Sequence, residues 1–307
     1  MVTTTPFDAG LTLIDLGFQR LPGVIASYLV ESAGERALLE VGPTSTIETL
    51  LAGLTQSGVQ PESISKVLVT HIHLDHAGAA GTFLRRFPRA HLYVHAAGLP
   101  HLVDPSRLLA SATRIYGEMM DVLWGDVEPV PADRVTALAD GDVVTVGDRQ
   151  LRALHTPGHA SHHVVFHDEQ SREVFTGDVA AVRLPDFAYV RPPTPPPELD
   201  LELWTQSLQR LSDLAPRRLY LTHFGPFDDV DRHLQQVGER LGAWEHLLRR
   251  AVAAGQDRPA MVDTLRQYGD RELLTETNDA TALERYELAT PYGMSVDGYL
   301  RYFRRHP

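Results

Sequence analysis

Four short segments of this chain combine an apolar stretch, typical of a buried β-strand, with a histidine or an aspartate at its carboxyl end. The side chains concerned are, in chain order, His71, His73, Asp75, His76, His159, Asp178 and His223. Because strands of one sheet can present their carboxyl ends at the same edge, ligands that are distant in sequence converge there. The pattern predicts an α/β fold with a metal-binding site at a sheet edge.

The densest segment reads Thr70-His71-Ile-His73-Leu-Asp75-His76. Side chains alternate along an extended backbone, so His71 and His73 point to the same side and can share one metal ion. Asp75 and His76 follow where the chain turns into a helix, so they point to a neighbouring position. A chance match to this arrangement of ligand residues is rare.

The three later ligands also follow predicted strands. His159 comes after the rigid turn Pro157-Gly158, and His223 ends the last predicted strand. Asp178 comes after Gly177, which permits a close approach of the backbone. Because a carboxylate has two oxygen atoms, Asp178 can bridge two cations. Together the seven side chains offer two cations only nitrogen and oxygen donors.

Composition excludes several other kinds of site. Cysteine is absent from the 307 residues, which rules out disulfides, thiolate ligands and thiol nucleophiles. The formal net charge of −12 disfavours general binding to nucleic acid, because an acidic surface repels phosphate. No run is apolar and long enough for a membrane helix, and the first residues lack the features of a secretory signal. We therefore expect a cytoplasmic protein with a small-molecule substrate and no nucleic-acid or membrane partner; a homodimer is left open.

Periodicity predicts the order of the elements. Runs rich in branched residues predict strands at residues 11–16, 23–30, 36–41, 66–70, 91–94, 143–146, 151–154, 164–167, 173–176 and 217–222. Helical spacing predicts helices within residues 44–54, 78–87, 104–124 and 199–214, and from Val230 onward. The proline-rich stretch between Leu184 and Leu199 is predicted to be a loop. We expect a catalytic domain over residues 1–228 and a helical segment over residues 229–307 that packs on it or caps it.

The histidine and aspartate motifs resemble, in their order, the successive metal-binding motifs of the metallo-β-lactamase superfamily. The matching motifs are His71-x-His73-x-Asp75-His76, Thr156-Pro-Gly-His159, Thr176-Gly-Asp178 and Thr222-His223. The resemblance spans residues from about Leu11 to His223 and is closest in character to glyoxalase II-like metallo-hydrolases. It implies a four-layer αββα sandwich with the metals at one edge, here with a helical C-terminal extension.

Carried over residue by residue, the resemblance also implies a division of the ligands. The ligands implied for the first ion are His71, His73 and His159. Those implied for the second ion are Asp75, His76 and His223, with Asp178 shared. We expect two zinc ions, although imidazole and carboxylate ligands also accept iron or manganese. A hydroxide bridging two such cations forms near neutral pH and would attack a thioester, a lactone or an ester. Asp75 is expected to help move the proton, so that Asp75 and Asp178 carry catalytic roles.

The chain departs from the family pattern in two places. The family usually has Ile-Asp-x-Gly where this chain has Glu40-Val-Gly42, and the longer carboxylate leaves the usual supporting contact open. After His159 the family often continues Thr-x-Gly, whereas here His162 and His163 follow, as partners of a ligand, substrate contacts or structural residues. Tyr189, in the proline-rich loop, is a further candidate for the substrate pocket.

The main competing function is that of a mononuclear non-haem iron oxygenase resembling the persulfide dioxygenases, with His71, His159 and Asp178 among its ligands. The complete second ligand set, including His223, favours the binuclear hydrolase. The acidic balance disfavours a phosphodiesterase or an RNA-processing enzyme, and the lack of an export signal disfavours a β-lactamase. Quorum-signal lactonases place a tyrosine shortly after the bridging aspartate, where this chain has Val179-Ala-Ala-Val182. A non-catalytic module is disfavoured by the intact ligand set.

Overall fold

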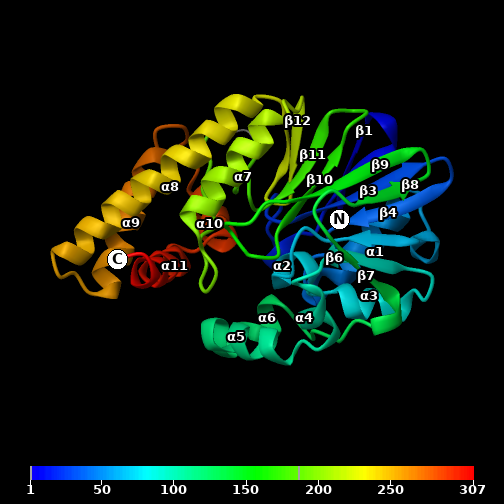
Figure 1. Ribbon diagram of the computed structural model, residues 1–307, viewed down its shortest axis with the longest axis horizontal. Coiled ribbons are helices and arrows are strands. Elements are labelled where there is room, and N and C mark those ends of the chain that lie inside the picture. The colour runs from blue at the N-terminus through cyan, green and yellow to red at the C-terminus, as the bar shows by residue number, and fades with distance from the viewer. Residues whose placement is uncertain (1, 186) are drawn as a thin grey trace. The chain divides into compact units, whose positions relative to one another are not determined.

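The computed structural model describes residues 2–185 and 187–307, and contacts within it divide the chain into two compact units (Figure 1). Unit 1 consists of the chain up to His155 together with residues 162–175. Unit 2 consists of residues 156–161 and 176–307. Of the predicted ligands, unit 1 therefore carries the first four, and unit 2 carries His159, Asp178 and His223.

The first sheet of unit 1 has its strands in the order of the chain. They are β1 (Thr3–Phe7), β2 (Leu11–Asp15), β3 (Ala26–Ser32), β4 (Glu35–Leu39), β5 (Lys66–Leu68), β6 (His91–His95) and β7 (Val135–Leu138). Pairs from β1 to β4 are antiparallel, and pairs from β4 to β7 are parallel. Parallel neighbours require crossover connections. The helices in these connections are α1 (Ile47–Gln56), α2 (Leu74–Ala77), α3 (Ala80–Arg86), α4 (Leu99–Val103), α5 (Ser106–Tyr116) and α6 (Met120–Leu123).

The second sheet begins in unit 1 as an antiparallel meander. Its strands there are β8 (Val143–Val146), β9 (Arg149–His155), β10 (Val164–Asp168) and β11 (Glu173–Gly177). The two sheets face each other, because Tyr28 of β3 packs edge-on against Phe175 of β11 with ring centroids 5.5 Å apart. Leu13 pairs with Tyr28 and shares its face, so the next residue, Ile14, points to the other face. There α1 covers it, and a Cβ added to Gly53 would lie 2.4 Å from Ile14 Cγ2.

Unit 2 takes over at the end of β11 and is mainly helical. Thr176 Oγ1 donates to Tyr220 O over 3.3 Å, which joins the end of β11 to the hairpin of β12 (Arg218–Leu221) and β13 (Gly225–Phe227). The helices of this unit are α7 (Leu201–Asp213), α8 (Val230–Ala253), α9 (Arg258–Leu273), α10 (Ala280–Ala289) and α11 (Tyr292–Arg305). Helix α8 packs against α7, α9 and α11.

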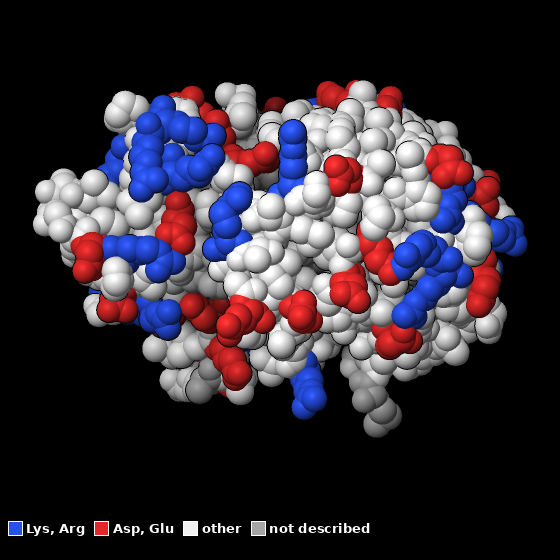
Figure 2. Space-filling model, turned by 90° about the horizontal axis from the view of Figure 1, so that it is seen from below, with Lys and Arg blue, Asp and Glu red and all other residues white. Residues whose placement is uncertain are grey.

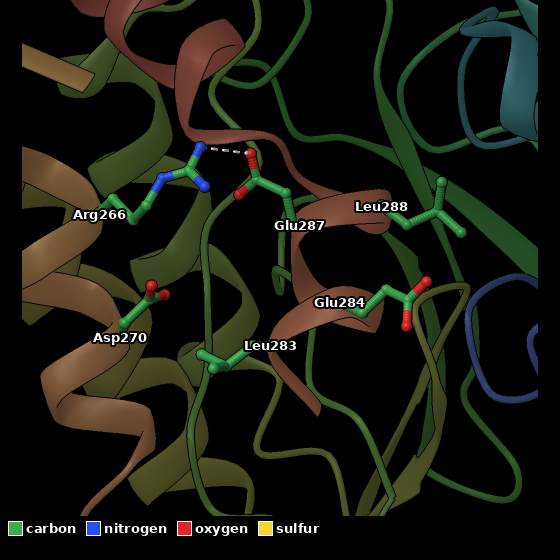
Figure 3. A pocket seen from close by; sticks show the side chains of 6 residues that line it. All are labelled: Arg266, Asp270, Leu283, Glu284, Glu287 and Leu288. Carbon is green, nitrogen blue, oxygen red and sulfur yellow. Dashed lines mark hydrogen bonds and ion pairs between the residues drawn. The ribbon is translucent and has the colours of Figure 1, made fainter. Parts of the chain in front are cut away.

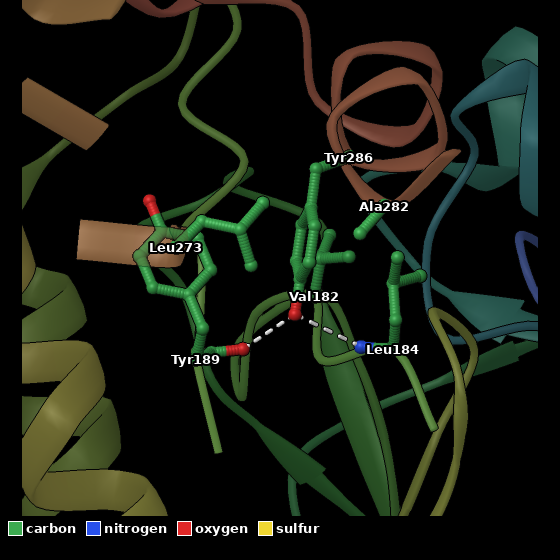
Figure 4. Packing of buried hydrophobic residues seen from close by; sticks show 6 residues of the cluster. All are labelled: Val182, Leu184, Tyr189, Leu273, Ala282 and Tyr286. Carbon is green, nitrogen blue, oxygen red and sulfur yellow. Dashed lines mark hydrogen bonds between the residues drawn. The ribbon is translucent and has the colours of Figure 1, made fainter. Parts of the chain in front are cut away.

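A buried cluster in unit 2 joins the loop after Asp178 to the C-terminal helices (Figure 4). Its fully buried members are Val182, Leu184, Tyr189, Leu273, Ala282 and Tyr286. The assignment of Tyr189 to a substrate pocket is therefore wrong, because its ring packs edge-on against Tyr286 with centroids 5.2 Å apart and has no exposed surface.

Most predicted elements are present, and the differences have local causes. Strands β1, β7 and β13 were not predicted from the sequence. All three are outermost strands of their sheets, and two of them, β1 and β13, contain prolines, Pro6 and Pro226. The single helix expected within residues 104–124 is interrupted at Gly117, whose φ of 53° lies outside the helical region. Within the described residues, no helix has the length and apolar character needed to cross a bilayer.

Candidate functional site

The densest ligand segment lies directly after β5 in unit 1. The chain runs extended through Thr70, whose carbonyl accepts from Val164 N over 2.8 Å, and enters α2 after His73. His71 Nε2 and His73 Nδ1 lie 2.9 Å apart, so both imidazoles point to the same position, as the alternation predicts. His71 is fully buried and His73 is partly exposed.

Asp75 and His76 form a second pair in the first turn of α2. Asp75 Oδ2 lies 3.8 Å from His76 Nε2, and the Asp75 side chain is 19% exposed while that of His76 is buried. The ring of His76 lies 4.0 Å from that of His71, centroid to centroid. Unit 1 thus presents two adjacent pairs of donors, one formed by His71 and His73 and the other by Asp75 and His76.

Glu40, which stands where the family usually has a shorter aspartate, still makes a supporting contact to this segment. Its carboxylate Oε1 accepts from Thr70 Oγ1 over 2.6 Å and lies 3.4 Å from His76 Nδ1. Glu40 is 1% exposed and has a φ of 64°, a left-handed conformation that is costly for a residue with a side chain. Such strain persists where the surrounding structure requires it, here to bring a carboxylate beneath the ligand segment.

The direction of the hydrogen bonds from His71 through Thr70 to Glu40 fixes the tautomer of His71. A carboxylate can only accept, so the Thr70 hydroxyl donates to Glu40. The Thr70 oxygen then accepts from His71 Nδ1, which lies 3.0 Å away. With its proton on Nδ1, His71 keeps the lone pair of Nε2 free of a proton and suited to a cation.

In unit 2, the Asp178 carboxylate lies between two histidines. Its Oδ2 is 3.2 Å from His159 Nε2, and its Oδ1 is 3.4 Å from His223 Nε2. All three side chains are nearly fully buried. Two donors held by one tetrahedral zinc ion lie roughly 3.3 Å apart, so both distances suit shared coordination. Each carboxylate oxygen is thus paired with a different imidazole, which is the arrangement a bridging ligand requires.

The His159 side chain is held by groups of unit 2. Its Nδ1 lies 2.8 Å from Pro193 O, which can only accept, so Nδ1 carries the proton and Nε2 is left for a cation. The preceding Gly158 has a φ of 135°, and a Cβ there would lie 2.4 Å from the Trp204 backbone of α7. Trp204 in turn donates from Nε1 to Val179 O over 2.8 Å, next to Asp178. Helix α7 therefore contacts the backbone next to both candidate ligands, His159 and Asp178.

His162 and His163 lie close to the ligand segment in unit 1. Their ring centroids are 6.1 Å and 5.0 Å from that of His71, and both residues are buried.

Tyr116 of α5 is near the candidate site and was not predicted from the sequence. Burial, with a smaller contribution from the nearby Asp75 carboxylate, raises the pKa of the Tyr116 phenol. The only sequence signal for Tyr116 is that it lies on an amphipathic helix, and this does not indicate that the phenol lies near Asp75.

Comparison with known proteins assigns the chain to a family. The sequence pattern of the metallo-β-lactamase superfamily matches residues 20–223, which is well over half of the chain. The protein belongs to this superfamily, and its two sheets flanked by helices are the metallo-β-lactamase fold. The superfamily binds metal ions, and the nitrogen and oxygen donors of the ligand segments suit that chemistry.

Individual relatives agree with this assignment. A metallo-β-lactamase fold-containing protein of Sulfurisphaera tokodaii is 28% identical and aligns over 74% of this chain and 84% of its own. An atrochrysone carboxyl ACP thioesterase of Aspergillus fumigatus is 29% identical over 70% of this chain, which spans about half (55%) of that relative. The crystal structure of a metallo-β-lactamase family protein from Thermus thermophilus superposes with a TM-score of 0.69 at 22% identity, covering 100% of this chain and 93% of that one.

Proposed function

We propose that this protein is a binuclear metal-dependent hydrolase that cleaves an ester-like bond, with thioesters as the leading substrate class. The observation that carries the proposal is the position of Asp178, whose two oxygens face His159 and His223 separately. A carboxylate that faced only one imidazole would suit a single ion. Unit 1 has two pairs of donors, so that each of two ions could be given one pair as further ligands.

The proposed ligand sets follow from these pairs and from the family pattern. The proposed ligands of one ion are His71, His73 and His159, and those of the other are Asp75, His76 and His223, with Asp178 shared. Two bound zinc ions would supply a shared hydroxide at neutral pH. Glu40, Thr70 and Pro193 hold the imidazoles in the tautomer that leaves Nε2 available. The Asp75 carboxylate, whose side chain is 19% exposed, would take up the proton that a water molecule loses when it becomes this hydroxide.

The thioester class is supported by the thioesterase name of a relative, and the charge of the surface disfavours a nucleic-acid substrate. On the face shown in Figure 2, basic side chains form separate patches with acidic side chains beside and between them, and no continuous basic groove runs across this face. A small acyl substrate suits such a surface better than a phosphate backbone does. Specificity would lie in the loops and helices around the site rather than in the sandwich.

Two measurements test the proposal. The first is elemental analysis of the purified protein, and the second is an assay with acyl-coenzyme A thioesters, lactones and nitrophenyl esters, with and without a chelator. We expect two zinc equivalents and turnover that the chelator abolishes. Asp178→Ala should lose metal and turnover, while the control Asp263→Ala, at an exposed position on α9, should keep both. A single iron with oxygen uptake, or an Asp178→Ala variant with both metals and full rate, would reject the assignment.

A further inference from the structure

The carbonyl that holds His159 belongs to a segment without helix or strand. Pro193 lies in residues 189–197, where the described backbone pairs only through the bridge between Val182 and Arg191. A metal ligand needs a fixed partner, because loss of such partners weakens metal binding. The segment must therefore be held from elsewhere in unit 2.

Arg191 is the first anchor of this segment, two residues before Pro193. Its side chain has no exposed surface, and its guanidinium lies 3.4 Å above the ring of Tyr292 of α11. Nη2 donates to Glu287 Oε2 over 3.1 Å, whereas Nε and Nη1 have no hydrogen-bond partner among the described residues. Glu287 is thus the carboxylate that balances a buried charge, and breaking such a pair from one side is strongly destabilising.

Glu287 also connects the segment to helix α9. Its other oxygen, Oε1, accepts from Arg266 over 3.1 Å, and both side chains line a pocket of about 530 Å³ (Figure 3). The Glu287 side chain is 35% exposed. Because the pocket already borders Glu287, removing this side chain would enlarge an existing space rather than open a cavity in the apolar core.

Further contacts hold the segment on both sides of Pro193. Tyr286 Oη donates to Tyr189 O over 2.6 Å and accepts from Leu184 N over 3.1 Å, as Figure 4 shows. Thr194 lies against α11 so closely that a Cβ on Gly298 would be 2.0 Å from its carbonyl oxygen. The segment therefore has hydrogen bonds or close packing to α10 and α11 before and after the proline.

We propose that Glu287 is a positioning residue for the metal ligand His159, and that the C-terminal helices act through it as part of the metal site. Without Glu287, the buried Arg191 guanidinium would lack its counter-charge and would move toward water. The backbone at Pro193 would move with it, and His159 would lose the acceptor that keeps its proton on Nδ1. The inference rests on the proposed function only in treating His159 as a ligand.

The test compares Glu287→Ala with Glu284→Ala, which removes a carboxylate from the same helix and the same pocket. In metal-free protein, ¹⁵N NMR of the histidine rings should show wild-type His159 with its proton on Nδ1 and Glu287→Ala with a mixture of tautomers. Zinc titration against a chelator should give a loss of affinity of about 10- to 100-fold for Glu287→Ala. Glu284→Ala should match the wild type in both measurements.

Two further variants keep the outcomes distinct. Tyr286→Phe leaves the aromatic packing in place, so it should fold if Glu287→Ala does not, and should shift the tautomer and the affinity in the same direction. His159→Ala reports on the metal site itself. If His159→Ala loses zinc while Glu287→Ala and Tyr286→Phe keep wild-type affinity and tautomer, the inference is wrong and the proposed function stands. If His159→Ala keeps full zinc affinity, the proposed function fails.

Discussion

Replacing Thr70 with valine tests the supporting group beneath the ligand segment with little change of shape. The substitution removes one hydroxyl that lies between the Glu40 carboxylate, 2.6 Å away, and His71 Nδ1, 3.0 Å away. Valine keeps the branched shape of threonine, so the packing of this buried side chain is largely preserved. The variant therefore separates the hydrogen bonds from the fold that positions them.

The expected loss can be worked from these two contacts. A hydrogen bond to a charged group contributes about 1.5–3 kcal/mol, and a buried donor left without a partner costs about 1–3 kcal/mol. Glu40 keeps a longer contact from Thr70 N, at 3.3 Å, and the two lost bonds share one hydroxyl. We therefore expect the free energy of unfolding of the metal-free protein to fall by about 3 kcal/mol, less than the sum of the upper values. Zinc affinity should fall by about 10- to 100-fold, because the tautomer of His71 is no longer fixed.

Urea unfolding of metal-free protein and zinc titration against a chelator measure the two effects. Thr82→Val is the matched control in the same unit, because the buried Thr82 hydroxyl has no hydrogen-bond partner within the described part of the chain. That change should leave zinc affinity unchanged and stability equal or slightly higher. The reasoning is refuted if Thr70→Val unfolds at the wild-type urea concentration and binds zinc as tightly as the wild type.

Two more changes probe unit 2. Burial lowers the pKa of His233, whose Nε2 donates to Ala180 O over 2.6 Å, to about 4. Between pH 6.5 and 4 the unfolded chain binds a proton that the folded chain does not, so stability falls as pH falls, by about 2 kcal/mol from pH 7 to pH 5. In urea unfolding, His233→Gln should remove this fall of the unfolding free energy between pH 7 and pH 5. If the unfolding free energy of the variant changes with pH as in the wild type, the prediction is wrong. Gly158→Ala should cost at least about 2 kcal/mol, because the new Cβ meets the Trp204 backbone at 2.4 Å. Gly242→Ala, where nothing described lies within 4 Å, should instead gain up to about 1 kcal/mol, and equal effects would refute the steric argument.

Strands and helices with strong periodicity were predictable from sequence. Strand β8 has the bounds of the predicted segment, residues 143–146, and β5 begins at Lys66 as expected. The edge strand β1 was missed because Thr3 to Phe7 is mostly exposed and contains a proline, so that no apolar alternation indicates it. The break at Gly117 was missed because apolar residues recur at helical spacing on both sides of it.

The candidate metal ligands were identifiable in the sequence because their motifs are compact, whereas the groups that support them were not identifiable. Thr70 is a neighbour of His71, but its partner Glu40 lies thirty positions earlier in the chain. The acceptor for His159 is the backbone carbonyl of Pro193, and because every residue has a backbone carbonyl, the residue type does not indicate this contact. The assignment of seven ligands to two ions and the division of the chain at residue 228 remain predictions.

The prolines of β1 and β13 have a consequence for how this protein behaves at high concentration. A sheet edge with a full row of backbone donors can recruit a strand from another molecule and start an aggregate. Pro6 and Pro226 each remove one donor from an outer strand, and β13 is only three residues long. These borders are therefore poor templates for intermolecular pairing, which should help the chain to stay dispersed while it folds.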